Sequence, residues 1–201
     1  MITFMSSLIC ITNRHLCKEN FLERIRKVSN AQPTAILLRE KDLSEGEYMA
    51  LAKQVIQICQ KDKTLCILHT FAQVAKELGV SAFHCPLHVL RELSPELKSN
   101  FSTLGASCHS LEEALEAQSL GCSYIIIGHI FNTDCKQGLS GRGIDFLRTI
   151  CQNISIPIYA IGGINNQNYS LIKQSGATGA CTMSGLMQYQ DVYNYLSLYP
   201  D

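Results

Sequence analysis

The sequence predicts a single (β/α)8 barrel, and three observations lead to that fold class. Short apolar runs rich in β-branched residues recur along the chain, and each is followed by a segment with helical spacing. Eight such strand–helix pairs can be placed one after another. The length of 201 residues, 46% of them hydrophobic, suits one well-buried domain. A doubly wound open sheet is the alternative, but that fold usually has fewer units and a crevice where the strand order reverses.

The N-terminal half contains four of the expected units. Its apolar runs are short and nearly uninterrupted, which is typical of parallel strands buried on both faces. The predicted strands are 8–12, 35–38, 65–68 and the weaker 82–84. The predicted helices are 19–29, 47–60 and 71–78, followed by a short helical turn around 89–90. The segment 47–60 has the clearest amphipathic spacing.

The C-terminal half repeats the rhythm more clearly. A capping box of Ser110 and Glu113 opens one helix, and Gly121 ends it. The predicted strands are 102–107, 123–127, 157–161 and 179–183. The predicted helices are 110–120, 143–151, 165–174 and a last one that ends near 198. No linker or low-complexity tract interrupts the pattern, so one domain is expected over 1–201.

Composition narrows the classes of partner and the compartment. The 17 basic and 17 acidic residues are interspersed without a basic stripe, so nucleic acid is not expected as a partner. No apolar run approaches the roughly 20 residues that span a bilayer, so no membrane association is expected. Residues 1–12 lack the basic start and cleavage site of a signal peptide. The ten cysteines form no C-x-x-C pair and mostly lie in apolar runs, which indicates a reduced, cytoplasmic chain. Cys135, in a polar loop, is the exception, and its role stays open.

The carboxyl ends of the strands are where a (β/α)8 barrel collects its chemistry. Two of the turns there are rich in small residues: Gly162–Gly163 after the seventh strand and Ser184–Gly185 after the eighth. Backbone N–H groups exposed at such turns can hold a phosphate, so a phosphate site is predicted at these four residues. The alternative is that the glycines only make a tight turn. The polar side chains expected at this end are Asn13, Arg39, Lys41, His69, His84, His109, His129 and Lys136.

His129 is the candidate for proton transfer. It follows Gly128 at the end of a buried strand, and an imidazole can give and take a proton near neutral pH. The alternative is a structural, hydrogen-bonded histidine. A metal centre is not expected, because the histidines lack neighbouring carboxylates and Pro86 interrupts the pair His84 and His88. The roles of His69 and His84 stay open.

Several motifs together resemble one known family. The segments 128–136 (GHIFNTDCK), 160–164 (AIGGI) and 183–185 (MSG) are the most specific, and 11–14, 38–42 and 107–114 extend the similarity with weaker motifs. They are similar to the thiamine phosphate synthase/TenI superfamily, whose fold is a (β/α)8 barrel. The resemblance covers nearly the whole chain.

Differences at a few positions suggest a branch of that superfamily. The synthases have a glutamine where this chain has Leu37, an Asn-Asp pair where it has His69–Thr70, and a Gly-Gln-x-Asp segment where it has 85–88. Mg²⁺ prefers oxygen ligands, so the loss of both carboxylates disfavours a Mg²⁺–diphosphate site. Gly128–His129, in place of a common Gly-Pro, is similar to the TenI branch, the thiazole tautomerases.

The resemblance implies an isomerase of thiamine biosynthesis. It would convert a carboxythiazole phosphate tautomer into the aromatic carboxythiazole ethyl phosphate, with His129 as the catalytic residue and no metal or other cofactor. The implied substrate-binding residues are Arg39, Lys41, Ser107, Thr133 and Lys136. Two alternatives remain: a thiamine phosphate synthase that uses Mg²⁺, and a non-catalytic ligand-binding barrel. The oligomeric state is open, a homo-oligomer included.

Overall fold

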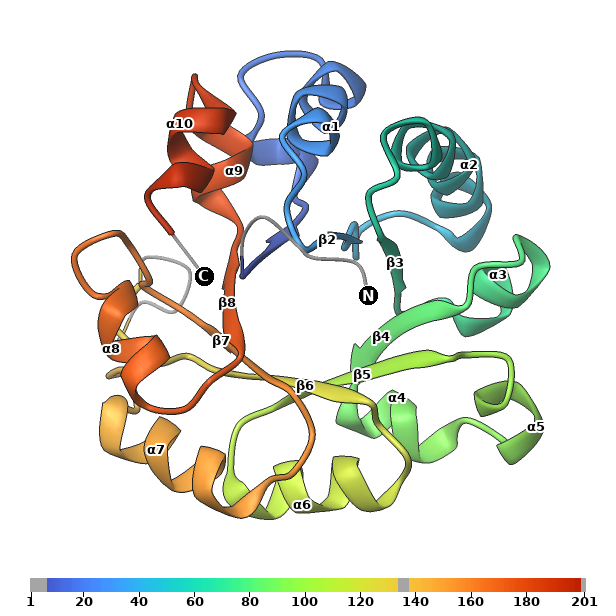
Figure 1. Ribbon diagram of the computed structural model, residues 1–201. Coiled ribbons are helices and arrows are strands. Elements are labelled where there is room, and N and C mark those ends of the chain that lie inside the picture. Colours follow the sequence, from blue (N-terminus) through green and yellow to red (C-terminus); the bar gives the residue numbers. More distant parts are fainter. Residues whose placement is uncertain (1–6, 134–137, 200–201) are drawn as a thin grey trace. The chain divides into compact units, whose positions relative to one another are not determined.

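The eight strands form a closed barrel in the order in which they follow along the chain (Figure 1). A computed structural model describes residues 7–133 and 138–199. The neighbouring strands whose register is described are parallel, as for Ile9 opposite Ala35 and Tyr159 opposite Gly179. The strands are β1 (Leu8–Ile11), β2 (Ala35–Leu38), β3 (Cys66–His69), β4 (Ala82–Pro86), β5 (Thr103–Cys108), β6 (Tyr124–Gly128), β7 (Ile158–Ile161) and β8 (Gly179–Thr182). The predicted (β/α)8 barrel is confirmed.

Helices follow the strands as the periodicity predicted, with local differences. They are the 3-10 turn η1 (Arg14–Leu16), α1 (Phe21–Asn30), α2 (Glu45–Asp62), α3 (Ala72–Glu77), α4 (Leu87–Glu92), α5 (Pro95–Lys98), α6 (Leu111–Ser119), α7 (Ile144–Asn153), α8 (Tyr169–Gln174), α9 (Ser184–Gln188) and α10 (Val192–Ser197). In place of the single turn predicted after β4 there are two helices, and Ser94 caps the second with its side chain. The predicted last helix is divided in two, because Asp191 caps a new start.

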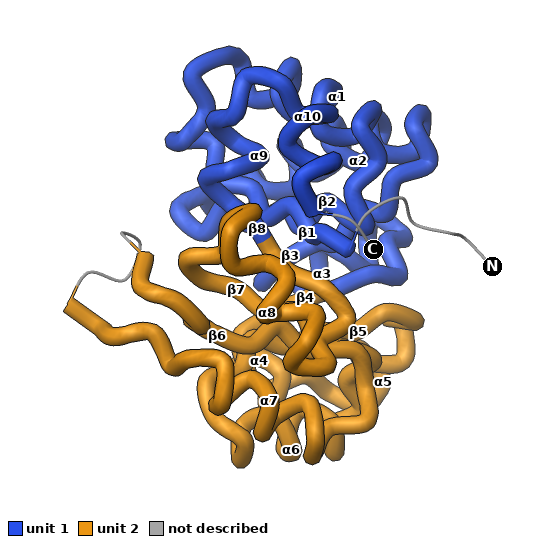
Figure 2. The backbone as a smooth tube through the Cα atoms, turned by 60° about the vertical axis from the view of Figure 1, so that its left-hand side comes forward, with its two compact units in different colours: residues 1–83, 182–201 blue, residues 84–181 orange. Residues whose placement is uncertain are grey.

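Two compact units divide the described chain, one within 1–83 and 182–201 and the other within 84–181 (Figure 2). In the first unit β1 and β2 are buried at every position, and α1 and α2 contribute Ile25 and Tyr48 to the core. In the second unit β6 is buried throughout, and Leu147 of α7 is fully covered. Fully buried strands explain why these runs are apolar without alternation. The extent of a single domain over 1–201 stays a prediction.

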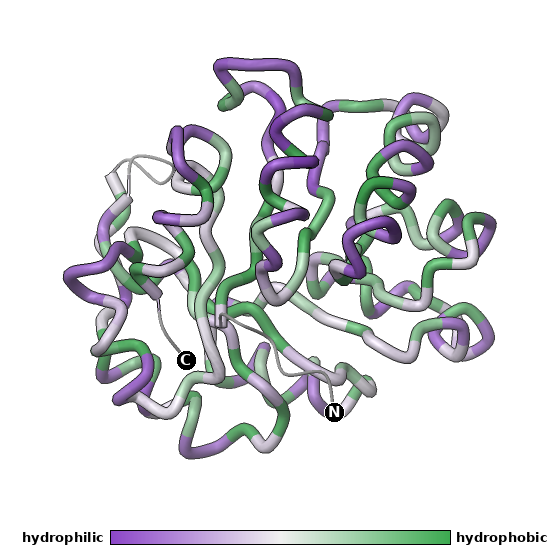
Figure 3. The backbone as a smooth tube through the Cα atoms, turned by 45° about the horizontal axis from the view of Figure 1, so that its top comes forward, coloured by the Kyte–Doolittle hydropathy of each residue, from purple (hydrophilic) through white to green (hydrophobic). Residues whose placement is uncertain are grey.

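Hydrophilic residues recur along the helices. Along them hydrophilic and hydrophobic stretches alternate, whereas the strands are mostly apolar (Figure 3). In the part of the chain that the structure describes, no helix combines the length and apolar character that crossing a membrane requires.

Candidate functional site

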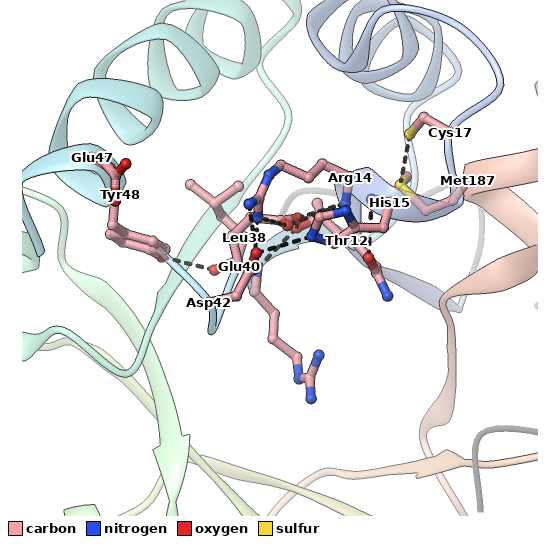
Figure 4. A network of polar contacts seen from close by, with 12 residues as sticks. Thr12, Arg14, His15, Cys17, Leu38, Glu40, Asp42, Glu47, Tyr48 and Met187 are labelled. Atoms are coloured by element: carbon pink, nitrogen blue, oxygen red, sulfur yellow. Dashed lines mark hydrogen bonds and ion pairs between the residues drawn. The ribbon is translucent and has the colours of Figure 1, made fainter. Parts of the chain in front are cut away.

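In the first unit, a buried carboxylate joins the segments that follow β1 and β2 (Figure 4). Glu40 is only 2% exposed. Its Oε1 accepts a hydrogen bond from Oγ1 of Thr12 at 2.6 Å, and both of its oxygens accept from the backbone N–H of Arg14 at 3.1 Å. The same Thr12 oxygen accepts from the backbone N–H of Arg39 at 2.9 Å. The backbone of this predicted substrate-binding residue is therefore held by Thr12 and, through it, by Glu40.

The Arg14 side chain extends this network to solvent. Its guanidinium donates to Glu40 at 3.2 Å and to both oxygens of Asp42 at 2.7 and 2.5 Å. Nε2 of His15 lies 2.9 Å from Asp42. Hydrogen bonds from Arg14 and then from His15 hold the pKa of the Asp42 carboxyl well below its usual range. Both carboxylates therefore already have cationic partners in this unit, which makes them poor candidates for metal ligands.

Arg39 and Lys41 follow β2, as predicted. Arg39 is half-buried and Lys41 is exposed. The alternation of burial along 39–41 places Glu40 inside and its two basic neighbours toward the surface. The role of Arg39 and Lys41 in binding an anionic ligand stays a prediction.

The end of β3 offers nitrogen and hydroxyl groups rather than carboxylates. His69 is buried, its backbone N–H donates to the Tyr48 hydroxyl at 2.8 Å, and Nδ1 of its ring contacts the hydroxyl of Thr70. At the end of β4, Cys85 is buried and is followed by Pro86. Among the described residues, no cluster of three or more His, Cys, Asp or Glu side chains could hold a metal ion. The residues at these positions do not fit a protein-held Mg²⁺, which needs oxygen ligands.

In the second unit, the segment after β6 continues to pair with β7. The backbone N–H of Ile130 donates to Ile161 at 2.9 Å, and that of Phe131 donates to Gly162 at 3.0 Å. Arg142 lies back against the start of this segment, since its backbone N–H donates to the carbonyl of His129 at 3.0 Å. This pairing fixes the backbone of residues 129–131 before the loop leaves the sheet.

His129 is half-buried, and its ring is already engaged. Nε2 lies 3.3 Å from the carbonyl oxygen of Leu139. A carbonyl only accepts, so Nε2 carries the hydrogen in this contact. Thr133 follows, half-buried. The predicted substrate-binding Lys136, with Cys135, lies outside the described residues.

Backbone conformation and packing together require glycine at the turn after β7. Gly162 and Gly163 have φ values of +102° and +64°. A Cβ at Gly162 would lie 2.8 Å from Cα of His129, and one at Gly163 would lie 2.8 Å from Cβ of Phe131. The left-handed backbone and the β6 segment that presses on it account for both glycines. The phosphate role of this turn therefore stays a prediction.

Packing also accounts for Gly185, at the start of α9. A Cβ there would overlap the hydroxyl of Tyr195 and would lie 2.7 Å from Oγ1 of Thr182. Those two hydroxyls are 3.0 Å apart, and the Tyr199 hydroxyl donates to that of Tyr195 at 3.0 Å. Sequence reasoning missed this hydroxyl cluster. Ser184 is exposed, and the phosphate role of Ser184 and Gly185 stays a prediction.

Sequence reasoning also missed how Ser107 and His84 relate. The hydroxyl of Ser107, near the end of β5, is 2.8 Å from Nε2 of His84 on β4. Nδ1 of the same ring is 3.0 Å from the hydroxyl of Tyr124 on β6. The only signal in the sequence was a histidine inside an otherwise apolar strand. The structure thus gives His84 two partners, where the sequence left its role open.

Comparison with known proteins identifies the family. A family model described as "Thiamine monophosphate synthase" matches residues 8–186. The chain belongs to this family. It is 32% identical over 192 residues to "Thiamine-phosphate synthase 2" of Streptococcus pneumoniae, with 92% of this chain and 89% of the relative covered. It is 33% identical over 190 residues to "Thiamine-phosphate synthase" of Pyrococcus abyssi, with 92% of this chain and 88% of the relative covered.

A solved structure agrees with these relatives. Thiamine phosphate pyrophosphorylase from Pyrococcus furiosus superposes with a TM-score of 0.82 at 29% identity, with 97% of this chain and 94% of that chain covered. More distant barrels, such as 3-hexulose-6-phosphate synthase at 12% identity and a TM-score of 0.70, share the fold alone.

These findings contradict the predicted thiazole tautomerase, and with it the isomerase class. The named relatives are synthases, which are transferases, and the similarity extends over most of the chain. The prediction was wrong because it gave a few positions, above all His129, more weight than the whole chain. The engaged ring nitrogen of His129 agrees with the structural alternative. The membership in the broader superfamily is confirmed, and the place of His129 in a site stays a prediction.

Proposed function

We propose that this chain acts as a thiamine-phosphate synthase, a transferase that joins a thiazole phosphate to a hydroxymethylpyrimidine diphosphate. The observation that carries the proposal is the 32% identity over 92% of the chain to the synthase of Streptococcus pneumoniae. The fold supports it through the Pyrococcus furiosus pyrophosphorylase. A cytoplasmic location belongs to the same proposal and rests on the biosynthetic class of these relatives.

The residues proposed to bind the two substrates suit their anionic groups. Arg39, Lys41 and Lys136 supply positive charge for phosphate and diphosphate oxygens. Ser107 and Thr133 supply hydroxyls, which can donate or accept at a heteroaromatic ring. The residues proposed for the phosphate itself are Gly162, Gly163, Ser184 and Gly185, through their backbone N–H groups.

No step of the proposed reaction is assigned to a bound metal. His69–Thr70 and 85–88 provide no carboxylate at the ends of β3 and β4, where the resembled synthases carry their aspartates. The chemistry assigned to this chain is binding, orientation and charge compensation by its own side chains. Bringing two substrates together in a fixed geometry is itself a large part of a transfer reaction.

That same lack of carboxylates favours a second candidate, a non-catalytic barrel that binds one or both substrates. The two candidates differ in product formation. A barrel that only binds would hold the substrates without joining them, whereas a synthase would release thiamine phosphate.

The test incubates the purified chain with both substrates, with and without Mg²⁺, and measures thiamine phosphate by chromatography. Product above the protein-free background is expected. Arg39→Ala should lower kcat/KM by about tenfold or more, because a charged contact to a phosphate is lost. Arg148→Ala, on the exposed face of α7, is the matched control and should leave kcat/KM unchanged. No product under either condition, with calorimetric binding retained, overturns the synthase in favour of the binding barrel.

A further inference from the structure

Three side chains of the second unit form a continuous hydrogen-bonded line from the core toward the end of β5. The Tyr124 hydroxyl is 3.0 Å from Nδ1 of His84, and Nε2 of His84 is 2.8 Å from the Ser107 hydroxyl. Tyr124 is 5% exposed and His84 is 1% exposed, whereas Ser107 is half-buried. The line therefore ends at the Ser107 hydroxyl, and Ser107 is the one side chain of these three that is partly exposed.

The contact between His84 and Tyr124 requires a glycine on the strand between them. Gly105 lies opposite Tyr124 in the β5–β6 register. A Cβ at Gly105 would overlap the Tyr124 ring and would lie 2.6 Å from Nδ1 of His84. Glycine within a strand usually weakens the strand. Here Gly105 has no side chain, so the rings of His84 and Tyr124 can meet across β5. The centroids of those rings are 5.5 Å apart.

Burial fixes the protonation of the inner end. It raises the pKa of the Tyr124 hydroxyl well above its ordinary value, so the phenol keeps its hydrogen. A neutral imidazole has one donor and one acceptor nitrogen. Either the phenol donates to Nδ1 and Nε2 donates to Ser107, or both hydrogen bonds run the other way. In each case, the imidazole sets whether Ser107 accepts or donates along the line, and so where its hydroxyl hydrogen points.

We propose that His84 and Tyr124 are positioning residues that orient the Ser107 hydroxyl toward a hydrogen-bonding group of the bound substrate. The inference rests on the proposed function for the identity of that substrate. It goes beyond that function by assigning a role to two buried residues that touch no ligand themselves. A fully satisfied buried polar line is also a rigid one, which suits a positioning role.

A double-mutant cycle tests the proposal. Tyr124→Phe removes one hydroxyl and keeps the buried ring, and Ser107→Ala removes the hydroxyl at the other end. If Tyr124 acts through Ser107, Tyr124→Phe should lower kcat/KM about five- to tenfold in the wild-type background and less than about twofold in the Ser107→Ala background. Tyr193→Phe, which loses a 3.2 Å hydrogen bond to Asn30 on the surface, is the control and should leave kcat/KM unchanged.

A spectroscopic readout tests the line in the free protein. In ¹⁵N-histidine-labelled protein, Tyr124→Phe should shift both ring nitrogen resonances of His84, because its Nδ1 loses a partner and its tautomer balance changes. Ser107→Ala should shift them as well, whereas Tyr193→Phe should not. If the His84 resonances are unchanged in both Tyr124→Phe and Ser107→Ala, the proposal is overturned, whatever the activity.

The outcomes separate this inference from the proposed function. An active wild type in which Tyr124→Phe costs the same factor in both backgrounds, or nothing, overturns the positioning role alone. If the wild type forms no product, the cycle is measured on the calorimetric Kd of the thiazole phosphate and of the pyrimidine diphosphate. Non-additive losses in Kd then support positioning although the synthase fails. Additive losses, or no binding of either compound, overturn the positioning role as well.

Discussion

The hydroxyl of Thr12 donates a 2.6 Å hydrogen bond to the buried carboxylate of Glu40 (Figure 4). Thr12 directly follows β1 and Glu40 lies two residues after β2, so the contact joins two segments that are 28 residues apart. Since the same hydroxyl oxygen accepts from the backbone of Arg39, the carboxylate supports a residue proposed to bind substrate without itself facing solvent.

Glu40→Gln should destabilise the protein. The oxygens of Glu40 face only donors, from Thr12 and Arg14, so an amide would turn an N–H₂ group toward one of them. We expect a loss of about 2–3 kcal/mol in the free energy of unfolding by urea. Asp145→Asn, at a side chain that is 96% exposed, is the control and should cost less than about 0.5 kcal/mol. Equal losses in both variants would contradict the role of Glu40.

The ion pair of Asp42 should make stability depend on acidity. Hydrogen bonds from Arg14 and His15 lower the pKa of the folded-state carboxyl. Its contribution is then fully present above the unfolded-state pKa of about 4, and it decreases as the pH falls from there toward the lower folded-state pKa.

The expected result is a difference in unfolding free energy between wild type and Asp42→Asn that is constant from about pH 5 to 7 and shrinks below about pH 4. Urea titrations across this range measure it. Because the carboxylate is exposed, added salt should also reduce the difference. If the difference in unfolding free energy between wild type and Asp42→Asn grows on acidification, the lowered pKa of Asp42 is contradicted.

Two glycines in helices should respond oppositely to the same change. Gly185→Ala should destabilise, because the new Cβ overlaps Tyr195 and approaches Thr182; we expect about 1–3 kcal/mol, as for other overpacked sites. A Cβ at Gly46, in α2, would have nothing within 4 Å of it, so Gly46→Ala should gain about 0.5 kcal/mol from helix propensity. Thermal unfolding of both variants checks the pair, and a neutral Gly185→Ala would show that the hydroxyl cluster can rearrange.

Three buried thiols should be unreactive in the folded protein. Burial raises the pKa of Cys85, Cys108 and Cys122 to about 12. At about pH 8 the thiolate fraction of such a group is about one in ten thousand, and the thiolate is the reactive form. Iodoacetamide at this pH should therefore label these three only after denaturation in urea, as mapped by mass spectrometry. Rapid labelling of any of them in the native protein would contradict the prediction.

The fold was predictable because its signals are local and repeated. Each buried strand is an apolar run, and signals such as the capping residue Ser110 mark where a helix begins. The region after β4 was predicted less well, since α4 and α5 are only six and four residues long and such short helices leave little periodicity to detect.

The places of the candidate site residues in the fold were predictable in part. Arg39, Ser107 and His129 were correctly placed at or near strand ends. The rule that polar residues of a barrel gather at the carboxyl ends of its strands depends only on strand order. The line from His84 to Ser107 and Tyr124 was not predictable, since its contacts span 23 and 40 residues of sequence. The enzyme class was predicted wrongly from single substitutions, which say little when one scaffold supports several chemistries.

The pairing between the β6 segment and the turn after β7 bears on attempts to exchange loops among members of this family. Gly162 and Gly163 have room for nothing larger because His129 and Phe131 lie on them. A graft of residues 129–143 from a relative whose backbone differs there would clash with Gly162 and Gly163. Chimaeras that carry both segments together should fold where chimaeras that carry the loop alone do not.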